Sequence, residues 1–259
     1  MEKNKIYMSD VLDFLSALED NSIDLAIVDP PYNLGKGKWD TFANSEAYFD
    51  FTFSWIDMLI PKLKPTASLY LFNTAYNSAV ILNHLRDRDL VFKNWITWYK
   101  KDGFSSTKKK YVNTQETILY YTKTVDGIFN CDDIRLPYLS TDRMAHAAKK
   151  GIVKNGKRWF PNPNGRLCND VWEITSQRHK EKVNGKTQAL SHPTIKPYEM
   201  IERMIKASSN KGDLVLDLFS GSGMTSFVSK ALNRDFIGCE GDEEYISHIE
   251  REGIEIGRL

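Results

Sequence analysis

The sequence predicts an α/β protein with a doubly wound, mostly parallel sheet and helices on both faces. Two observations lead to this prediction. Short apolar runs alternate along the chain with segments of helical periodicity, and strands and helices that alternate at these lengths form parallel sheets. At 259 residues the chain is also long enough to bury one full core and to carry one sizeable insertion. Its hydrophobic fraction of 41% and charged fraction of 27% are ordinary for a globular protein and favour no other class.

The N-terminal half begins this alternation with the apolar run at 23–28, which predicts a buried strand. The two prolines that follow exclude a helix and a central strand beyond that point. Further on, apolar residues at helical spacing predict helices, and aromatic and β-branched runs are typical of strands. The elements predicted after the first strand are a helix at 48–63, a strand at 68–72, a helix at 77–88 and strands at 95–99 and 117–121.

The segment from about residue 130 to residue 190 interrupts the alternation. Its periodicity fades while glycine, proline and asparagine become frequent, so it predicts a loop-rich insertion within a single domain that spans residues 1–259. The alternation then resumes. The elements predicted there are a helix at 197–209, a strand at 214–218, a glycine-rich turn, a helix at 224–232, a strand at 236–239 and a terminal helix.

This insertion is strongly basic. Between residues 143 and 188 the chain has eleven Lys and Arg against three Asp and Glu, a net charge of +8, whereas the whole chain has a net charge of only +1. Such a concentration favours a surface that binds a polyanion, with a solvated loop region as the alternative. The candidate phosphate contacts are Lys149, Lys150, Lys157, Arg158, Arg178 and Lys180.

The sequence indicates neither a targeting segment nor a metal site. The N-terminus lacks the apolar core of a signal peptide and no stretch reaches the length of a membrane span, so we expect a cytoplasmic protein. The three cysteines, Cys131, Cys168 and Cys239, form no Cys-x-x-Cys pair and are typical of reduced thiols. The five histidines have no ligand spacing either, so we expect no metal site.

The most specific motif is Asp29-Pro30-Pro31-Tyr32, directly after the first predicted strand. In open α/β sheets ligands bind beyond the carboxyl ends of the strands, so this loop is placed for chemistry. The Asp29 carboxylate and the Pro30 carbonyl can both accept hydrogen bonds from one planar amine, and the prolines fix the direction of that carbonyl. The Tyr32 ring offers a surface on which a base can stack. A purely structural Pro-Pro turn is the less favoured alternative.

A second strand end carries the glycine-rich turn Asp217-Leu-Phe-Ser-Gly-Ser-Gly223. Its glycines permit a ligand to approach the backbone closely, and the helix that follows offers free amides. Glu240 follows the next strand about 20 residues further on, where an acid can accept hydrogen bonds from ribose hydroxyls. Each signal alone is weak, because glycines also serve packing and Glu240 can be read as a solvated carboxylate at a helix start.

These motifs, in this order, resemble the β group of amino-methylating DNA methyltransferases. In that family an Asp-Pro-Pro-Tyr motif precedes a Phe-x-Gly-x-Gly motif, with a target-recognition segment between them. The match covers nearly the whole chain outside residues 130–190, and in size and motif order the sequence is similar to the MboII-type modification enzymes of bacterial restriction systems. The resemblance implies a Rossmann-like fold with circularly permuted motif order, S-adenosylmethionine as the cofactor, duplex DNA as the partner and residues 130–190 as the target-recognition segment.

The resemblance also implies roles for individual residues. Asp29 and Pro30 lie at the target amine, with Pro31 in the same catalytic loop and Tyr32 against the flipped base. Among the cofactor residues, Asp217 is expected near the amino group, Glu240 at the ribose and Asp10 at the adenine. The full set expected at the cofactor is Asp10, Asp217, Phe219, Ser220, Gly221, Ser222, Gly223, Thr225 and Glu240, joined by His192, Thr194 and Lys196 of the stretch His192-Pro-Thr-Ile-Lys-Pro197. That stretch can also be read as a helix start capped by Thr194.

Together these features predict methyl transfer to the exocyclic amine of a base extruded from the duplex. Adenine N6 is favoured over cytosine N4, because the N4 enzymes of this family usually carry Ser at the position of Asp29. The alternatives are an RNA or protein substrate and a catalytically silent nucleic-acid-binding subunit, the last of which the intact 29–32 loop opposes. The residues do not give the oligomeric state, but many relatives are dimeric, so a homodimer is one state to expect.

Overall fold

The computed structural model describes residues 1–101, 108–176, 180–183, 186–189 and 195–259. Its helices are α1 (Val11–Ala17), α2 (Ser45–Leu59), α3 (Ala75–Leu85), α4 (Thr141–Lys150), α5 (Tyr198–Ser208), α6 (Met224–Ala231) and α7 (Glu243–Arg251). Its strands are β1 (Lys5–Met8), β2 (Ile23–Val28), β3 (Leu63–Asn73), β4 (Val91–Tyr99), β5 (Gln115–Thr122), β6 (Ile152–Lys154), β7 (Lys157–Trp159), β8 (Val171–Glu173), β9 (Lys180–Val183), β10 (Lys186–Ala189), β11 (Leu214–Asp217), β12 (Asp235–Glu240) and β13 (Glu255–Arg258). Short 3-10 helices lie at Lys38–Asp40 (η1), Ile60–Lys62 (η2) and Cys131–Ile134 (η3).

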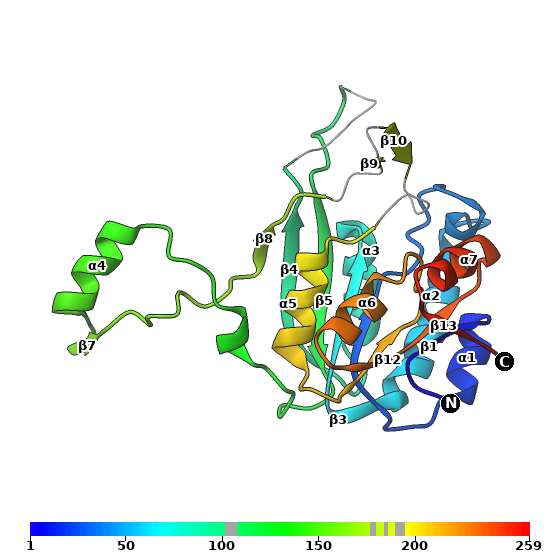
Figure 1. The fold of residues 1–259 in the computed structure, drawn as a ribbon, viewed down its shortest axis with the longest axis horizontal. Coiled ribbons are helices and arrows are strands. Elements are labelled where there is room, and N and C mark those ends of the chain that lie inside the picture. The colour runs from blue at the N-terminus through cyan, green and yellow to red at the C-terminus, as the bar shows by residue number, and fades with distance from the viewer. Residues whose placement is uncertain (102–107, 177–179, 184–185, 190–194) are drawn as a thin grey trace.

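Nine of the described strands form one central sheet in the order β13-β1-β12-β11-β2-β3-β5-β4-β8 (Figure 1). Neighbouring strands run parallel except at β5, which is antiparallel to both β3 and β4. The predicted mostly parallel α/β sheet is therefore confirmed. Strands β1 and β13 extend it at one edge, and neither was predicted, because charged residues stand within these short runs, Lys5 in β1 and Glu255 and Arg258 in β13, and leave no continuous apolar stretch.

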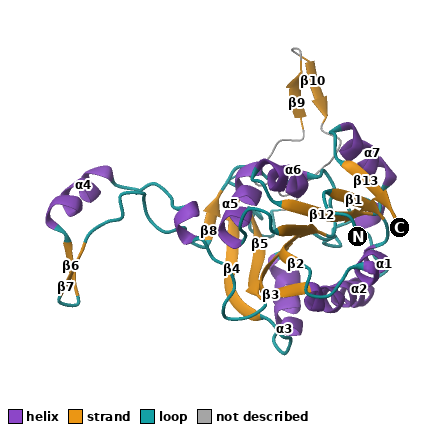
Figure 2. Cartoon of the chain, turned by 60° about the horizontal axis from the view of Figure 1, so that its bottom comes forward, coloured by secondary structure: helices purple, strands orange, loops and turns teal. Residues whose placement is uncertain are grey.

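Helices cover both faces of this sheet, with α1, α2 and α3 on one side and α5, α6 and α7 on the other (Figure 2). The side chains of β2 alternate between the two faces. Ala26 and Val28 belong to the apolar cluster that contains α1 and α2, whereas Leu25 and Ile27 belong to the cluster that contains α5 and α6. Because both faces are covered, the strand is apolar throughout, as a central parallel strand must be.

Local capping sets the helix boundaries and explains where they differ from the prediction. Helix α2 begins three residues before the predicted start, because the Asn44 side chain accepts a hydrogen bond from the amide of Ala47 at 2.8 Å. It ends at Leu59, and Pro61 stands in the 3-10 turn η2 that follows. The Thr74 hydroxyl caps α3 in the same way as Asn44 caps α2.

The predicted insertion divides into a projecting arm and a part of the central sheet. Two backbone hydrogen bonds between Leu136 and Arg166, at 2.9 and 2.8 Å, close the base of the arm, which we define as residues 136–166. The arm contains α4 and the β6–β7 hairpin and stands clear of the body (Figures 1 and 2). Beyond it, β8 pairs with β4 as the sheet's edge strand, and Trp172 of β8 is buried in the core. The 130–190 segment is thus only partly an insertion.

Candidate active site

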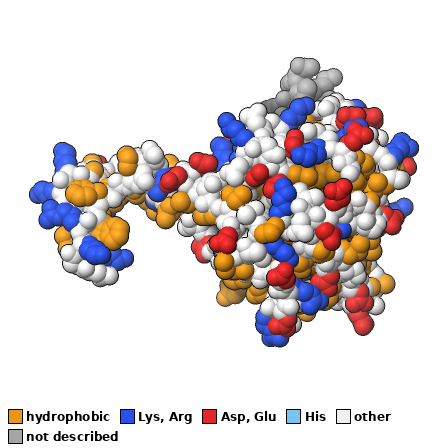
Figure 3. Space-filling view, turned by 90° about the horizontal axis from the view of Figure 1, so that it is seen from below, with side chains coloured by type: hydrophobic (Ala, Val, Ile, Leu, Met, Phe, Trp, Pro, Cys, Tyr) orange, Lys and Arg blue, Asp and Glu red, His pale blue; other side chains and the backbone are white. Residues whose placement is uncertain are grey.

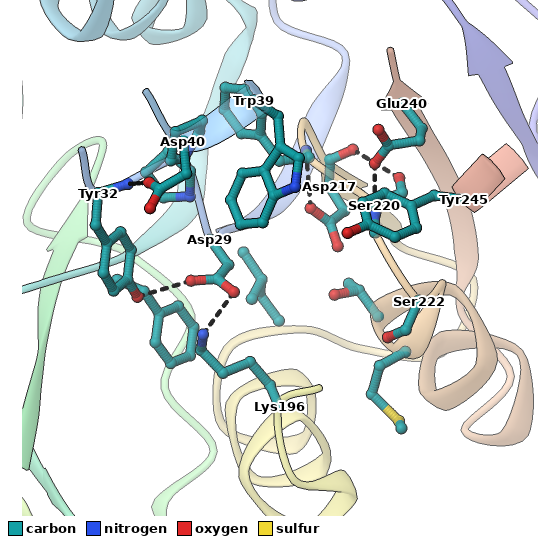
Figure 4. A pocket seen from close by; sticks show the side chains of 18 of the residues that line it. Asp29, Tyr32, Trp39, Asp40, Lys196, Asp217, Ser220, Ser222, Glu240 and Tyr245 are labelled. Atoms are coloured by element: carbon teal, nitrogen blue, oxygen red, sulfur yellow. Dashed lines mark hydrogen bonds and ion pairs between the residues drawn. The ribbon is translucent and has the colours of Figure 1, made fainter. Parts of the chain in front are cut away.

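The two sequence motifs meet at the carboxyl edge of the central sheet. Strands β2 and β11 are parallel neighbours, with Leu25 opposite Val215 and Ala26 opposite Leu216, so the loops that follow them begin side by side. A cavity lies between these loops (Figure 4). Its lining includes all four residues of the 29–32 loop and eight of the predicted cofactor residues, namely Lys196, Asp217, Phe219, Ser220, Gly221, Ser222, Thr225 and Glu240.

The 29–32 loop is held in place by a buried carboxylate that the sequence did not single out. Asp40, only 1% exposed, accepts hydrogen bonds from backbone amides on the far side of the loop, those of Tyr32 at 2.6 Å, Asn33 at 2.8 Å, Leu34 at 3.0 Å and Lys36 at 3.1 Å. These amides have no strand or helix partner, so the carboxylate takes the place of regular structure. It fixes the backbone that positions Asp29.

The carboxylate of Asp29 has two donors in this structure, one on each oxygen (Figure 4). The Tyr32 hydroxyl donates to Oδ1 at 2.7 Å and the Lys196 ammonium donates to Oδ2 at 2.5 Å. Burial would lower the pKa of Lys196, but the carboxylates of Asp29 and Glu116 outweigh it and the pKa is raised, so the ammonium keeps its charge. Burial and the same two carboxylates raise the pKa of Tyr32, so its hydroxyl keeps its proton.

Glu116, the second residue of β5, adds another carboxylate to the same site. Its Oε2 lies 3.3 Å from the Tyr32 hydroxyl and 3.6 Å from the Lys196 nitrogen, and its Oε1 accepts from Lys100. Burial would raise the pKa of Glu116, but the ammonium groups of Lys196 and Lys100 outweigh it and the pKa is lowered. Two carboxylates and two ammonium groups therefore form one charge-balanced cluster with the Tyr32 hydroxyl between the acids.

The glycine-rich turn faces this cluster from the other side of the cavity. Gly221 has a φ of +50°, which favours glycine, and its amide donates to the Glu240 carboxylate at 2.7 Å. The other Glu240 oxygen accepts from the amide of Asp242 at 2.9 Å. Burial raises the pKa of Glu240 against the effect of these two hydrogen bonds. Gly223, with a φ of +77°, is the residue from which α6 begins.

Asp217 is the most strongly perturbed acid of the turn. Burial raises its pKa to about 7, although hydrogen bonds from Thr225 and from the amide of Phe219 oppose the shift and the charges of Asp29 and Glu240 add to it. The raised pKa favours the protonated form of Asp217, and a cation in the cavity would favour the ionised form.

The remaining predicted cofactor residues lie in different places. The carboxylate of Asp10 caps α1 by accepting from the amide of Leu12 at 2.8 Å, and Asp10 is not among the residues that line the cavity. Lys196 lines the cavity at the Asp29 end, where its ammonium contacts carboxylates. His192 and Thr194 lie outside the described residues, so the predicted Thr194 cap of α5 stays a prediction.

Several residues of this site are not distinguished by any pattern in the sequence. Glu116 precedes a predicted strand, and its position becomes informative only when β4 and β5 are known to pair antiparallel, which brings it opposite Trp98. Trp39, next to Asp40 in η1, and Tyr245 of α7 also line the cavity. Nothing in the local sequence around 33–40 distinguishes Asp40 from an ordinary loop carboxylate.

Four of the six candidate phosphate contacts lie on the arm and outside the lining of this cavity, and Figure 3 shows Lys and Arg side chains gathered at the end of the arm. Lys149 and Lys150 end α4, while Lys157 and Arg158 belong to β7, and all four are exposed. Trp159 and Phe160, at 60% and 61% exposure, stand beside them. Of the other two candidate phosphate contacts, Lys180 begins β9 and Arg178 lies outside the described residues.

The described part of the chain contains no group of three or more His, Cys, Asp or Glu residues arranged to hold a metal ion. None of its helices has the length and apolar character needed to cross a bilayer.

Comparison with known sequences shows the family. A family model described as DNA methylase matches residues 23–251. The chain is 53% identical over 247 residues to the Type II methyltransferase M1.MboII of Moraxella bovis, which covers 95% of each chain. It is 39% identical to the Type II methyltransferase M.HpaI of Haemophilus parainfluenzae, with 93% of this chain and 71% of the relative covered. The resemblance inferred from the motifs is thereby confirmed.

Solved structures agree on the fold at low sequence identity. The M1.HpyAVI complex with SAM is 21% identical, with a TM-score of 0.58 and coverage of 96% of this chain and 97% of that one. The PvuII DNA methyltransferase, described as cytosine-N4-specific, is 18% identical, with a TM-score of 0.70 and coverage of 96% and 86%. The two motifs line one cavity, and the chain is similar to these methyltransferases in sequence and in fold. The chain therefore belongs to the DNA methylase family, the N6- and N4-methylating DNA methyltransferases.

Proposed function

We propose that this protein transfers the methyl group of S-adenosylmethionine to the exocyclic N6 of adenine in duplex DNA, as the modification enzyme of a bacterial restriction–modification system. One observation carries the proposal. The Asp29-Pro30-Pro31-Tyr32 loop and the glycine-rich turn line one cavity at the carboxyl edge of the sheet, which is where α/β proteins bind ligands. An amine acceptor and a cofactor turn thus face each other across the same space.

The glycine-turn side of the cavity fits a cationic cofactor. Asp217 and Glu240 present carboxylates there, while Ile201 and Met224 contribute apolar surface. S-adenosylmethionine supplies an electrophilic methyl group on a sulfonium and also carries an ammonium group. Asp217 is placed to bind that ammonium, Glu240 the ribose hydroxyls, and the backbone at Gly221 admits the ligand closely because no side chain projects there.

The Asp29 side of the cavity fits the target amine. The amine of a paired base is buried in the duplex and its lone pair is delocalised, so the base must be extruded before it reacts. The Asp29 carboxylate and the Pro30 carbonyl would each accept a hydrogen bond from the target amine and would direct its nitrogen lone pair toward the glycine-turn side of the cavity, while the Tyr32 ring would support the base. Asp29 at this position favours adenine N6 over cytosine N4.

DNA binding is assigned to the arm and the basic residues around it. Six candidate phosphate contacts lie between residues 149 and 180, and those on α4 and β7 are exposed on an element that stands clear of the body. We therefore place the target-recognition function in residues 130–190 and keep 1–259 as one catalytic domain. An enzyme that modifies chromosomal DNA acts in the bacterial cytoplasm, and a homodimer is the assembly to test first.

Labelled methyl transfer tests this function directly. Purified protein is incubated with tritium-labelled S-adenosylmethionine and, in parallel, with unmethylated duplex DNA, with RNA and with a protein extract. Label in the DNA alone is the expected result. Label in RNA or protein alone would change the substrate class, and no transfer to any of them would make the chain a silent subunit.

A further inference from the structure

Both oxygens of Asp29 already accept strong hydrogen bonds, which sets a problem for the target amine. Tyr32 occupies Oδ1 and Lys196 occupies Oδ2. A hydrogen bond from a hydroxyl draws negative charge away from the oxygen that accepts it, so Oδ1 is a weaker acceptor for an amine while Tyr32 remains in place. The amine gains its strongest contact with Asp29 after one donor has turned away.

Of the two donors, Tyr32 is the one that has a second acceptor within hydrogen-bond distance. Its hydroxyl has one hydrogen to donate and stands between two carboxylates, at 2.7 Å from Asp29 Oδ1 and 3.3 Å from Glu116 Oε2. Lys196 is 2.5 Å from Asp29 but 3.6 Å from Glu116, beyond hydrogen-bond distance. A small rotation of the hydroxyl hydrogen therefore moves the Tyr32 bond from one acid to the other, whereas Lys196 stays on Asp29.

The surroundings of Glu116 make it a good acceptor for that hydrogen bond. Its side chain is only 13% exposed, and the lowered pKa keeps it ionised and able to accept. Lys100 holds its other oxygen, which fixes the direction of Oε2 toward Tyr32. The sheet does not need a glutamate side chain at this position, because the pairing of Glu116 with Trp98 is made by the backbone.

We infer that Glu116 is a positioning residue of the methyl-transfer site, which accepts the Tyr32 hydroxyl when the target amine binds to Asp29. The inference rests on the proposed role of Asp29. It assigns to Glu116 no contact with the base or the cofactor. Its contribution is to free Asp29 Oδ1, so it acts on the transfer step and not on the binding of either substrate.

A double-mutant cycle tests this exchange. Glu116→Gln keeps the size of the side chain but replaces the carboxylate by a weaker neutral acceptor, and Tyr32→Phe keeps the ring but removes the hydroxyl that must be received. Single-turnover methyl transfer is measured with enzyme in excess over unmethylated mixed-sequence duplex DNA and tritium-labelled S-adenosylmethionine. Calorimetric affinity for S-adenosylmethionine is measured on every variant to verify a folded cofactor site.

The exchange predicts strong coupling between the two positions. Glu116→Gln alone should slow transfer by about tenfold or more, whereas the same change in the Tyr32→Phe background should cost less than about threefold. Cofactor affinity and the KM for DNA should change little in either case. Equal losses in the two backgrounds would overturn the inference, because a merely structural Glu116 costs the same with or without the hydroxyl.

Three further variants keep the test decisive. If Glu116→Gln fails to fold, Glu116→Ala takes its place in the same cycle. The exchange again predicts a smaller loss of transfer rate in the Tyr32→Phe background than in the unmodified chain, and equal losses contradict it. Asp57→Asn, a carboxylate-to-amide change in an exposed pair with Arg88, is the matched control and should have no effect. Asp29→Ala separates the two proposals. Full activity of Asp29→Ala would refute the proposed function. Loss of its activity, with no coupling between Glu116 and Tyr32 in the cycle, would refute only the exchange.

Discussion

At the scale of single residues, the proposed methyl transfer depends on Asp29 and on the groups that surround it. The motif around Asp29 could be found from the sequence because a strand, an acid, two prolines and an aromatic follow one another directly. Its ion pair with Lys196 could not, because the two residues are separated by 167 positions. Only the packing of α5 against the sheet brings them together.

Asp29→Ala should abolish most turnover while leaving cofactor affinity nearly unchanged. The variant removes the acceptor of the reacting amine, and loss of one such preorganised group typically costs about 100- to 1,000-fold in rate. Single-turnover transfer and calorimetry measure the two quantities separately. A near-normal transfer rate would remove Asp29 from the reaction, and lost cofactor binding would assign it to the cofactor site.

Cofactor binding should strengthen as the pH rises through about 7. Burial raises the pKa of Asp217 to about 7, and a cationic ligand binds better to the ionised form. The free energy of unfolding of the cofactor-free protein should change in the opposite direction. The stability that this raised pKa contributes is present at low pH and is lost as the pH rises through 7. Calorimetry from about pH 6 to about pH 8 in buffers of different ionisation enthalpy should show proton release on binding. A flat profile, or one unchanged in Asp217→Asn, would contradict the assignment.

At the scale of elements, the sequence predicts most of the sheet and helices but not the edges or the loop supports. Continuous apolar runs such as β2 and β11 are recognisable because both of their faces are buried. The four-residue strands β1 and β13 are not, and the place of β8 at the opposite edge depends on contacts with β4. Asp40 likewise acts on a loop through the backbone amides of other residues, which no side-chain pattern reveals.

Asp40→Ala should loosen the loop that carries Tyr32. The bond between the Tyr32 amide and Asp40 is buried, and a buried amide left without an acceptor costs about 1–3 kcal/mol, so the 32–36 backbone should rearrange to reach water. We expect faster tryptic cleavage at Lys36 and Lys38 together with a loss of turnover of about tenfold or more. Asp57→Ala, an exposed carboxylate on α2, is the control. Unchanged protease resistance in Asp40→Ala would show that the loop holds its own conformation.

At the scale of the whole molecule, we expect the positive charge of the arm to govern the affinity for duplex DNA. Reversing Lys149, Lys150, Lys157 and Arg158 to Glu should weaken binding to duplex DNA and reduce the slope of log affinity against log salt concentration by about one unit per lost phosphate contact. Binding isotherms across a salt series measure both. Cofactor affinity should be unaffected, because these residues lie outside the cavity. An unaltered slope would mean that the arm faces solvent in the complex.

Mass spectrometry of nucleosides from duplex DNA treated with this protein and S-adenosylmethionine tests the proposed reaction most directly. We expect N6-methyladenine, formed by the unmodified chain and nearly absent with Asp29→Ala. N4-methylcytosine without N6-methyladenine would contradict the assignment of the target base, and N6-methyladenine at equal levels with both proteins would contradict the role of Asp29.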